Sequence, residues 1–413
     1  MMIQMKSKNK TKVLFCKVVM LSLLLAPIIG IYGPESYSYE FILTSLLAVV
    51  SLFLFGFKSN LPKVILYYLI YAAIISAAHA TSSSELIPLG VIRILLVFMM
   101  YFNAFHFDWF IKWYRILAFV FISFFLFQEF TYLTTGYRMS GLIESLPMHI
   151  AKGNMSMLVS AQEYMERSSS FFSEPSHFAQ FLLPLLAVEI YAKHKYHLIS
   201  TGVIALSLFL SQSGNAIFGM IAIVVVYMYY VFHRTSKTKI RLIVLSVLTA
   251  IIVIPFVANS EKGQALIERT EQLTDTEVQR GEVSEFIRIY RGYYLYAILN
   301  VRDKIVGVGN QSTARYYIDH SSLSAIFEDD ILYLNAFQFF LVLTGLVGCI
   351  TFFYIMYWFW HRADIVGKST IAIIFSLSFV ASLYFSPTMA ICLLIAYKSP
   401  NSFLDVSKQS KLI

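Results

Sequence analysis

Long apolar runs separated by short polar segments repeat along almost the whole chain. Each run has about the length of a helix that crosses a bilayer, because about 20 apolar residues cover about 30 Å of hydrocarbon. The pattern therefore predicts an all-α polytopic membrane protein, a bundle of about 11–12 transmembrane helices. The predicted spans are 13–33, 39–57, 62–80, 86–107, 110–130, 174–192, 197–213, 214–232, 241–258, 331–358 and 370–397.

The last apolar run is long for one crossing and short for two. Ser386-Pro387-Thr388 interrupts it, and proline cannot continue a helix that precedes it, because it has no backbone N–H. We expect one full helix followed by a short twelfth helix that crosses or re-enters. The basic tail favours a cytoplasmic C-terminus, and so twelve crossings.

Composition and charge narrow the class of protein. Of the 413 residues, 58% are hydrophobic and 14% are charged, against about 25% charged in average soluble domains. These values exclude a soluble enzyme and a disordered chain. The net charge is +8, and the basic residues occupy alternate short loops, as the positive-inside rule requires. This pattern predicts a cytoplasmic N-terminus and gives no reason to expect a nucleic-acid partner.

Two long polar segments lie outside the cell in this topology. We expect an amphipathic helix at 282–300, whose apolar positions recur with helical spacing, lying on the membrane face. The predicted organisation is a five-helix membrane segment at 1–130, a first large outer loop at 131–173, a central four-helix membrane segment at 174–258, a second large outer loop at 259–330, and a C-terminal membrane segment with a cytoplasmic tail at 331–413.

The first group of candidate residues leads from the first outer loop into the next span. Arg167 and His177 are ionisable residues close to the membrane, where such residues are functional by default. Glu174 can complement the helix dipole or act as a general base. Capping by Ser173 and a first-turn Pro175 would explain part of this motif without any function.

The second group lies on the predicted amphipathic helix. Arg288 and Arg291 are spaced i and i+3, so both guanidinium groups project from one face, with Tyr290 between them in sequence. Two planar donors suit a diphosphate. The alternative is solvated pairing with Glu282 and Glu285, which contributes little.

A third group precedes the span at 331–358. His320 or a carboxylate such as Asp330 could act as a general base at the membrane surface. The acids Glu328, Asp329 and Asp330 could equally serve only to complement a helix dipole.

Three further polar residues lie in or between spans. Arg93 lies roughly 10 Å inside its span by the helical rise, so it should face a cavity or an anionic partner. Ser213 and Asn215 belong to a tight turn, where they cap helix ends or face a cavity. Because the chain has no nucleotide-binding or metalloprotease motif, we expect no cofactor and no metal.

Three segments together resemble the bacterial Wzy-type polysaccharide polymerases and, more distantly, the O-antigen ligases. They are RSSSFFSEPSHFAQ at 167–180, LSQSGNAIFGMI at 210–221, and RIYRGYYLYAILN at 288–300, which GVGN and then YLNAFQFFLVLTGLVG at 333–348 follow. The layout of about a dozen spans with two large outer loops matches the family over most of the chain.

The resemblance implies glycosyl transfer at the outer face of the bacterial cytoplasmic membrane. The donor would be a glycan on undecaprenyl diphosphate, and the acceptor a sugar hydroxyl of a lipid-linked repeat unit of capsule, O-antigen or another exopolysaccharide. A flippase and a chain-length regulator would be partners in the same membrane. The implied site residues are Arg167, Arg288, Arg291 and Arg93 for the diphosphate, His320, Asp330 or Glu174 for the base, and His177, Ser213, Asn215 and Tyr290 for the cavity wall.

Two alternatives remain open at this point. An O-antigen-type ligase shares the layout, but the family's ligases carry His-Asn where this chain has Glu328-Asp329-Asp330. A polysaccharide or lipid transporter would place ionisable residues or broken helices near the membrane midplane. Only Arg93 has such a position in the sequence, which favours the polymerase.

Overall fold

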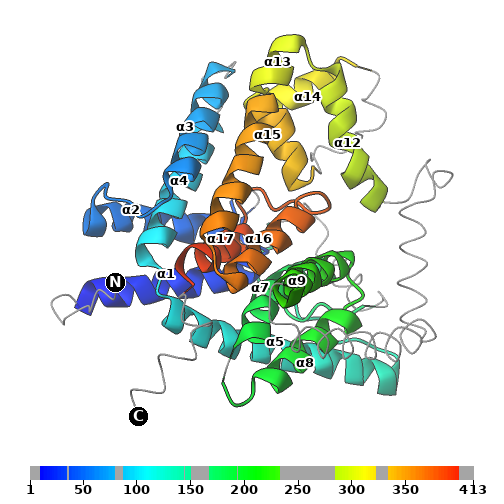
Figure 1. Ribbon diagram of the computed structural model, residues 1–413. Coiled ribbons are helices and arrows are strands. Elements are labelled where there is room, and N and C mark those ends of the chain that lie inside the picture. The colour runs from blue at the N-terminus through cyan, green and yellow to red at the C-terminus, as the bar shows by residue number, and fades with distance from the viewer. Residues whose placement is uncertain are drawn as a thin grey trace. The chain divides into compact units, whose positions relative to one another are not determined.

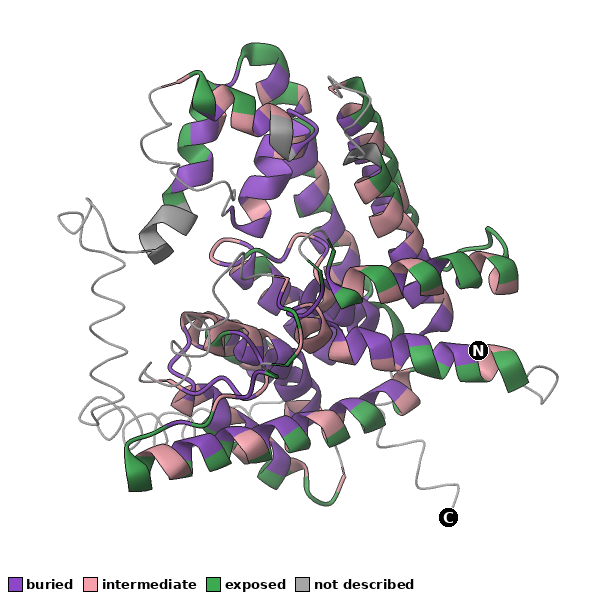
Figure 2. Cartoon of the chain, turned by 180° about the vertical axis from the view of Figure 1, so that it is seen from behind, coloured by how far each residue is buried: buried purple, intermediate pink, exposed green. Residues whose placement is uncertain are grey.

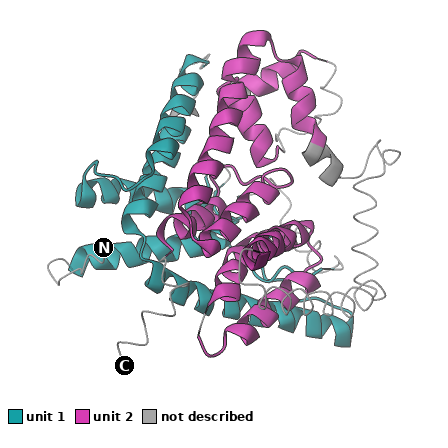
Figure 3. Ribbon diagram, in the orientation of Figure 1, with its two compact units in different colours: residues 1–174 teal, residues 175–413 magenta. Residues whose placement is uncertain are grey.

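The computed structural model describes residues 10–34, 37–79, 87–143, 145–149, 167–192, 194–232, 284–321 and 334–399. Within these ranges every regular element is an α-helix (Figure 1). One isolated bridge joins Tyr32 to Met148. The chain divides into two compact units, Met1–Glu174 and Pro175–Ile413 (Figure 3). The predicted all-helical class is therefore confirmed for the described residues.

The first unit is built from helices that follow the first five apolar runs. Helix α4 packs against α1, α2 and α3, and α5 packs against α1. Polar groups mark the helix ends: the Ser38 hydroxyl accepts the Phe41 N–H at the start of α2, and Gly136 adopts a left-handed conformation after α5. The helices are α1 (Lys10–Ile29), α2 (Tyr39–Phe55), α3 (Lys63–Ala78), α4 (Ile87–Ala104) and α5 (Phe107–Thr135).

The second unit contains an apolar bundle and a group of more polar helices. In the bundle α16 packs against α9, α17 and α7, and Gly219 of α9 lies directly against Leu183 of α7. Its helices are α7 (Pro175–Tyr191), α8 (His197–Leu210), α9 (Gly214–Phe232), α12 (Ser284–Ile298), α13 (Val301–Val306), α14 (Gln311–Asp319), α15 (Ala336–Arg362), α16 (Ile365–Leu377) and α17 (Pro387–Lys398).

Among the described residues, four helices, α1, α5, α9 and α15, are long and apolar enough to cross a membrane, and six shorter apolar helices accompany them. Several of these helices carry exposed residues (Figure 2), among them large apolar ones, with Leu14 63% exposed, Phe130 63% and Val225 60%. A lipid environment accommodates such surfaces, whereas water does not. The chain is a membrane protein by these criteria. The predicted span at 241–258 lies outside the described residues.

Helix α15 differs from the single straight span that the apolar run at 331–358 predicts. Its Gly345 has φ 63° and ψ −160°, and the helix turns back on itself there. The rings of Phe337 and Phe353 lie 5.8 Å apart, although 16 residues of straight helix would separate them by about 24 Å. The hairpin therefore has a short first limb before Gly345 and a longer second limb after it. Hydropathy could not reveal the turn, because both limbs are apolar.

The last apolar run is interrupted as predicted, but it forms two short helices where one full helix and a short twelfth helix were expected. Helix α16 has 13 residues and α17 has 12, so each is about 18–20 Å long, less than the hydrocarbon thickness of about 30 Å. The Ser386 hydroxyl accepts the Met389 N–H at the start of α17. The N–H of Phe337 donates to the carbonyl of Ser378 at 2.9 Å. The first limb of α15 thus begins beside the interruption between α16 and α17.

Candidate functional site

Helix α12 lies within the predicted amphipathic range and carries both arginines of the second candidate group. Arg291 is only 5% exposed, whereas the neighbouring Tyr290 and Tyr294 are exposed. The outward face of α12 is thus aromatic and its buried face carries a cation. Exposed aromatic rings suit the interface between lipid and water. The side chain of Arg288 is outside the described residues, although its backbone belongs to α12.

The buried face of α12 packs closely on the first limb of α15. A Cβ atom added to Gly292 would lie 2.6–2.7 Å from the side chain of Gln338, so only glycine permits this approach. Gln338 is fully buried and completes a capping box with Asn335 at the start of α15. Arg291 therefore lies next in sequence to the tightest contact between α12 and α15.

Helices α12, α13 and α14 form one helical insert seated on α15. A hydrophobic cluster, including Leu295, Val308, Ile318 and Val342, joins the insert to α15, and α13 also packs against α15. The N–H of Val308 donates to the carbonyl of Val342 at 3.0 Å, next to the turn at Gly345. The Gly-Val-Gly sequence at 307–309 thus binds the tip of the α15 hairpin, which is the close backbone approach expected of such glycines.

A hydrogen-bonded group links α13 to α14 inside the helical insert. The Tyr317 hydroxyl donates to Asp303 Oδ2 at 2.6 Å, and Asn300 Nδ2 donates to the same oxygen at 3.0 Å. Burial and then the Asp303 carboxylate raise the pKa of Tyr317 to about 12. Tyr317 therefore remains a hydrogen-bond donor at physiological pH. Sequence analysis did not find this group, although Asn-x-x-Asp at a helix start is a capping signal.

His320 lies at the C-terminal end of α14 and is exposed. Its ring lies 4.1 Å from that of Tyr316, and its Nδ1 is 2.9 Å from the Tyr316 carbonyl oxygen. A hydrogen bond donated from Nδ1 leaves Nε2 as the basic nitrogen. His320 therefore retains a nitrogen that could accept a proton. Asp330, with Glu328 and Asp329, lies outside the described residues.

The serines after Arg167 anchor their segment to α5. Ser170 is fully buried, its N–H donates to Gln128 Oε1 at 2.8 Å, and its hydroxyl donates to the Phe121 carbonyl at 2.8 Å. Arg167 is half-buried, while Glu174 is exposed at the end of the first unit. Much of this motif therefore has a structural role, and Arg167 and Glu174 remain the candidates for chemistry.

A buried ion pair that sequence analysis missed lies beside this segment. Arg138 is 1% exposed and its guanidinium is 3.5 Å from the Glu129 carboxylate, which is also buried. Arg138 Nε donates to the Ser168 hydroxyl at 3.0 Å, and the guanidinium lies 3.6 Å from the centre of the Tyr132 ring. The only signal in the sequence was that Glu129 lies near the end of the apolar run at 110–130 and that Arg138 follows the run.

Arg93 of α4 binds groups on α2. Its guanidinium is 3.4 Å from Glu40 Oε1, donates to the Thr44 hydroxyl at 2.6 Å, and lies 3.9 Å from the centre of the Phe41 ring. The anionic partner of Arg93 is thus a carboxylate of the first unit.

The predicted cavity residues, Tyr290 included, belong to the second unit. Ser213 is 3% exposed and precedes α9, whereas Asn215, in the first turn of α9, and His177, in the first turn of α7, are half-buried. The Ser213 carbonyl accepts the Ala216 N–H at 3.0 Å. These residues lie at the N-terminal ends of α7 and α9.

The second unit brings together Arg291, Tyr290 and His320 in one helical insert. Arg167, Glu174 and Arg93 belong to the first unit. A diphosphate held by Arg167 together with the arginines of α12 would join the two units, and it stays a prediction. In the described ranges, no group of three or more His, Cys, Asp and Glu side chains could hold a metal ion.

No protein-family model matches this chain, and no curated protein matches it.

Proposed function

We propose that the protein is a membrane glycosyltransferase that polymerises lipid-linked oligosaccharide repeat units into a surface polysaccharide. The observation that supports this proposal is the buried Arg291 of α12, held beneath an exposed aromatic face and seated on the apolar α15. A polyprenyl diphosphate has the complementary arrangement, because its anionic headgroup adjoins a hydrocarbon chain. A cation at the border of an apolar helix suits that headgroup.

In the proposed reaction, a hydroxyl oxygen of the acceptor sugar attacks the anomeric carbon of the donor glycan. The bond from that carbon to the diphosphate breaks, and undecaprenyl diphosphate leaves with the electron pair. The hydroxyl proton passes to a base, for which His320, Asp330 and Glu174 are the candidates. Arg291, with Arg167 and Arg288, would stabilise the charge of the leaving diphosphate. No cofactor is needed, because the link to the diphosphate already activates the sugar.

An O-antigen-type ligase would use the same donor chemistry with a different acceptor. The geometry of the insert is therefore as compatible with a ligase as with a polymerase. The sequence Glu328-Asp329-Asp330 in place of His-Asn favours the polymerase.

A transporter or flippase is the second candidate, and one structural observation favours it. Transporters commonly bind their substrates where helices are interrupted. The turn at Gly345 and the break between α16 and α17 are two such interruptions in the second unit. The described charges, however, lie in the helical insert or near the ends of the apolar helices, apart from those of Arg93, Lys17 and Arg115.

Deleting the gene distinguishes these functions through the surface glycan. Loss of a polymerase should leave single repeat units and remove the long-chain ladder on a gel. Loss of a ligase would keep long chains on the lipid carrier, and loss of a flippase would leave repeat units facing the cytoplasm. Long polymer of normal length in the deletion strain would refute the polymerase.

Topology provides an independent test. Reporters fused after Asn154 and after Gln279 should be extracytoplasmic, and one fused after Lys237 should be cytoplasmic. A cytoplasmic result at Gln279 would place the helical insert on the side where nucleotide sugars are found, and would exclude the proposed chemistry.

A further inference from the structure

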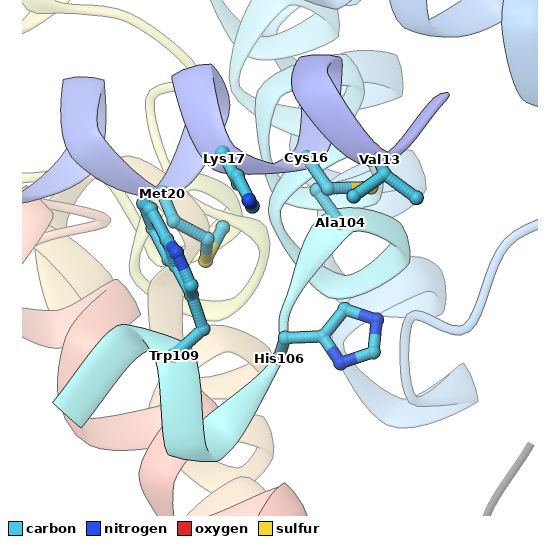
Figure 4. Close-up of a pocket in the computed structure, with 7 residues that line it drawn as sticks. All are labelled: Val13, Cys16, Lys17, Met20, Ala104, His106 and Trp109. Atoms are coloured by element: carbon cyan, nitrogen blue, oxygen red, sulfur yellow. The ribbon is translucent and has the colours of Figure 1, made fainter. Parts of the chain in front are cut away.

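A pocket of about 260 Å³ lies between α1 and the turn that joins α4 to α5, within the first unit (Figure 4). Two basic residues, Lys17 and His106, line it together with apolar side chains. In Figure 4 the Lys17 side chain points from α1 toward the start of α5, where His106 and Trp109 lie. The apolar lining consists of Val13, Cys16, Met20, Ala104 and Trp109.

Lys17 occupies an unusual position for a cation. It is seven residues from the start of α1 at Lys10, so it lies roughly 10 Å along a helix that is apolar enough to cross a membrane. It is exposed, and among the described residues no acidic side chain pairs with it. A lysine at such a depth is costly unless its charge meets an anion or reaches the interface.

The surroundings of the pocket are basic and aromatic. Lys12 precedes Lys17 on α1, and Lys112 and Arg115 lie on α5. The acidic residue in the first turn of α5 is Asp108. The rings of Trp109 and Trp113 lie 5.9 Å apart, and tryptophans collect at the membrane interface. The alternation of charge between loops assigns this end of α1 to the cytoplasmic face, where anionic lipids attract basic segments.

We propose that this pocket binds the headgroup phosphate of an anionic phospholipid of the cytoplasmic leaflet. Lys17 forms the ion pair, His106 donates a hydrogen bond to a phosphate oxygen, and Met20 and Trp109 contact the start of the acyl chains. The site is independent of the proposed glycosyl transfer, which would take place on the opposite face of the membrane. Its role is to hold α1 against α5 through a bound lipid.

Fluorescence quenching in bilayers tests the proposal. The full-length protein, with Trp113, Trp358 and Trp360 replaced by phenylalanine, is reconstituted in phosphatidylcholine that contains dibrominated lipid. Dibrominated phosphatidylglycerol should occupy the site beside Trp109 about fivefold more than dibrominated phosphatidylcholine, the preference expected of one lysine near a phosphate. Lys17→Gln should remove the preference, and Lys17→Arg should keep it.

Lys63→Gln is the matched control, because Lys63 is an exposed lysine assigned to the same face and lies outside the pocket. It should leave the preference unchanged. Equal quenching by the two brominated lipids, or an equal loss in Lys63→Gln and Lys17→Gln, would overturn the proposal. Displacement of the phosphatidylglycerol by an equimolar polyprenyl phosphate would also overturn it, because the occupant would then be a prenyl lipid.

Discussion

Replacing Gly345 by alanine should strongly destabilise the second unit. The residue has φ 63° and ψ −160°, a region that only glycine occupies readily. An added Cβ would also lie 2.5 Å from the Gly307 nitrogen and 2.6 Å from the Ile305 carbonyl carbon. Both neighbours are backbone atoms, so rotation of a side chain cannot relieve the clash.

The two effects can be given magnitudes. Backbone strain and overpacking each cost about 1–3 kcal/mol, which together give a loss of about 2–6 kcal/mol. The free energy of unfolding of a folded domain is only about 5–15 kcal/mol, so Gly345→Ala removes a large part of it. The helical insert should separate from the α15 hairpin first, because the clash lies at their contact.

The assay is thermal unfolding of the purified protein in detergent, and the readout is the fraction of protein that remains monodisperse at each temperature. Gly345→Ala should lower the midpoint by at least about 5 °C. Gly202→Ala in α8 is the control, because no atom lies within 4 Å of its added Cβ. Alanine there is more favourable than glycine by about 0.5–1 kcal/mol. Equal midpoints for the two variants would refute the assigned role of the turn.

Three further outcomes are expected. Arg291→Ala should abolish polymer on the glycan gel at normal protein level, and Arg291→Lys should restore it only partly, since lysine lacks the bidentate fork. The control Arg315→Ala, which breaks an exposed ion pair, should have little effect on the same gel. Removing either partner of the buried Glu129–Arg138 pair should cost about 3–5 kcal/mol in thermal unfolding, and replacing both with apolar residues should cost less. Because the pKa of Tyr317 is raised to about 12, its contribution to stability is complete below about pH 10 and is lost as the pH rises toward 12. Tyr317→Phe should therefore flatten the fall of the unfolding midpoint over that range, and identical slopes would contradict this.

The sequence by itself determined where most helices lie. The ends of α2 and α9 agree with the apolar runs at 39–57 and 214–232 to within two residues, because hydrocarbon accepts a chain only as a helix with its backbone hydrogen bonds satisfied. The helical spacing around Arg291 likewise predicted α12. The interruption at Ser386-Pro387-Thr388 likewise marked the start of α17.

Only the tertiary structure decided the direction of the chain within an apolar run. Hydropathy is the same for a straight helix and for a hairpin, so the turn at Gly345 depended on the close approach of Gly307. The burial of Arg291 and the pairing of Glu129 with Arg138 were also undetermined by sequence. Each depends on which helix faces are covered by segments distant along the chain, and a buried charge is stable only after that packing supplies its partners.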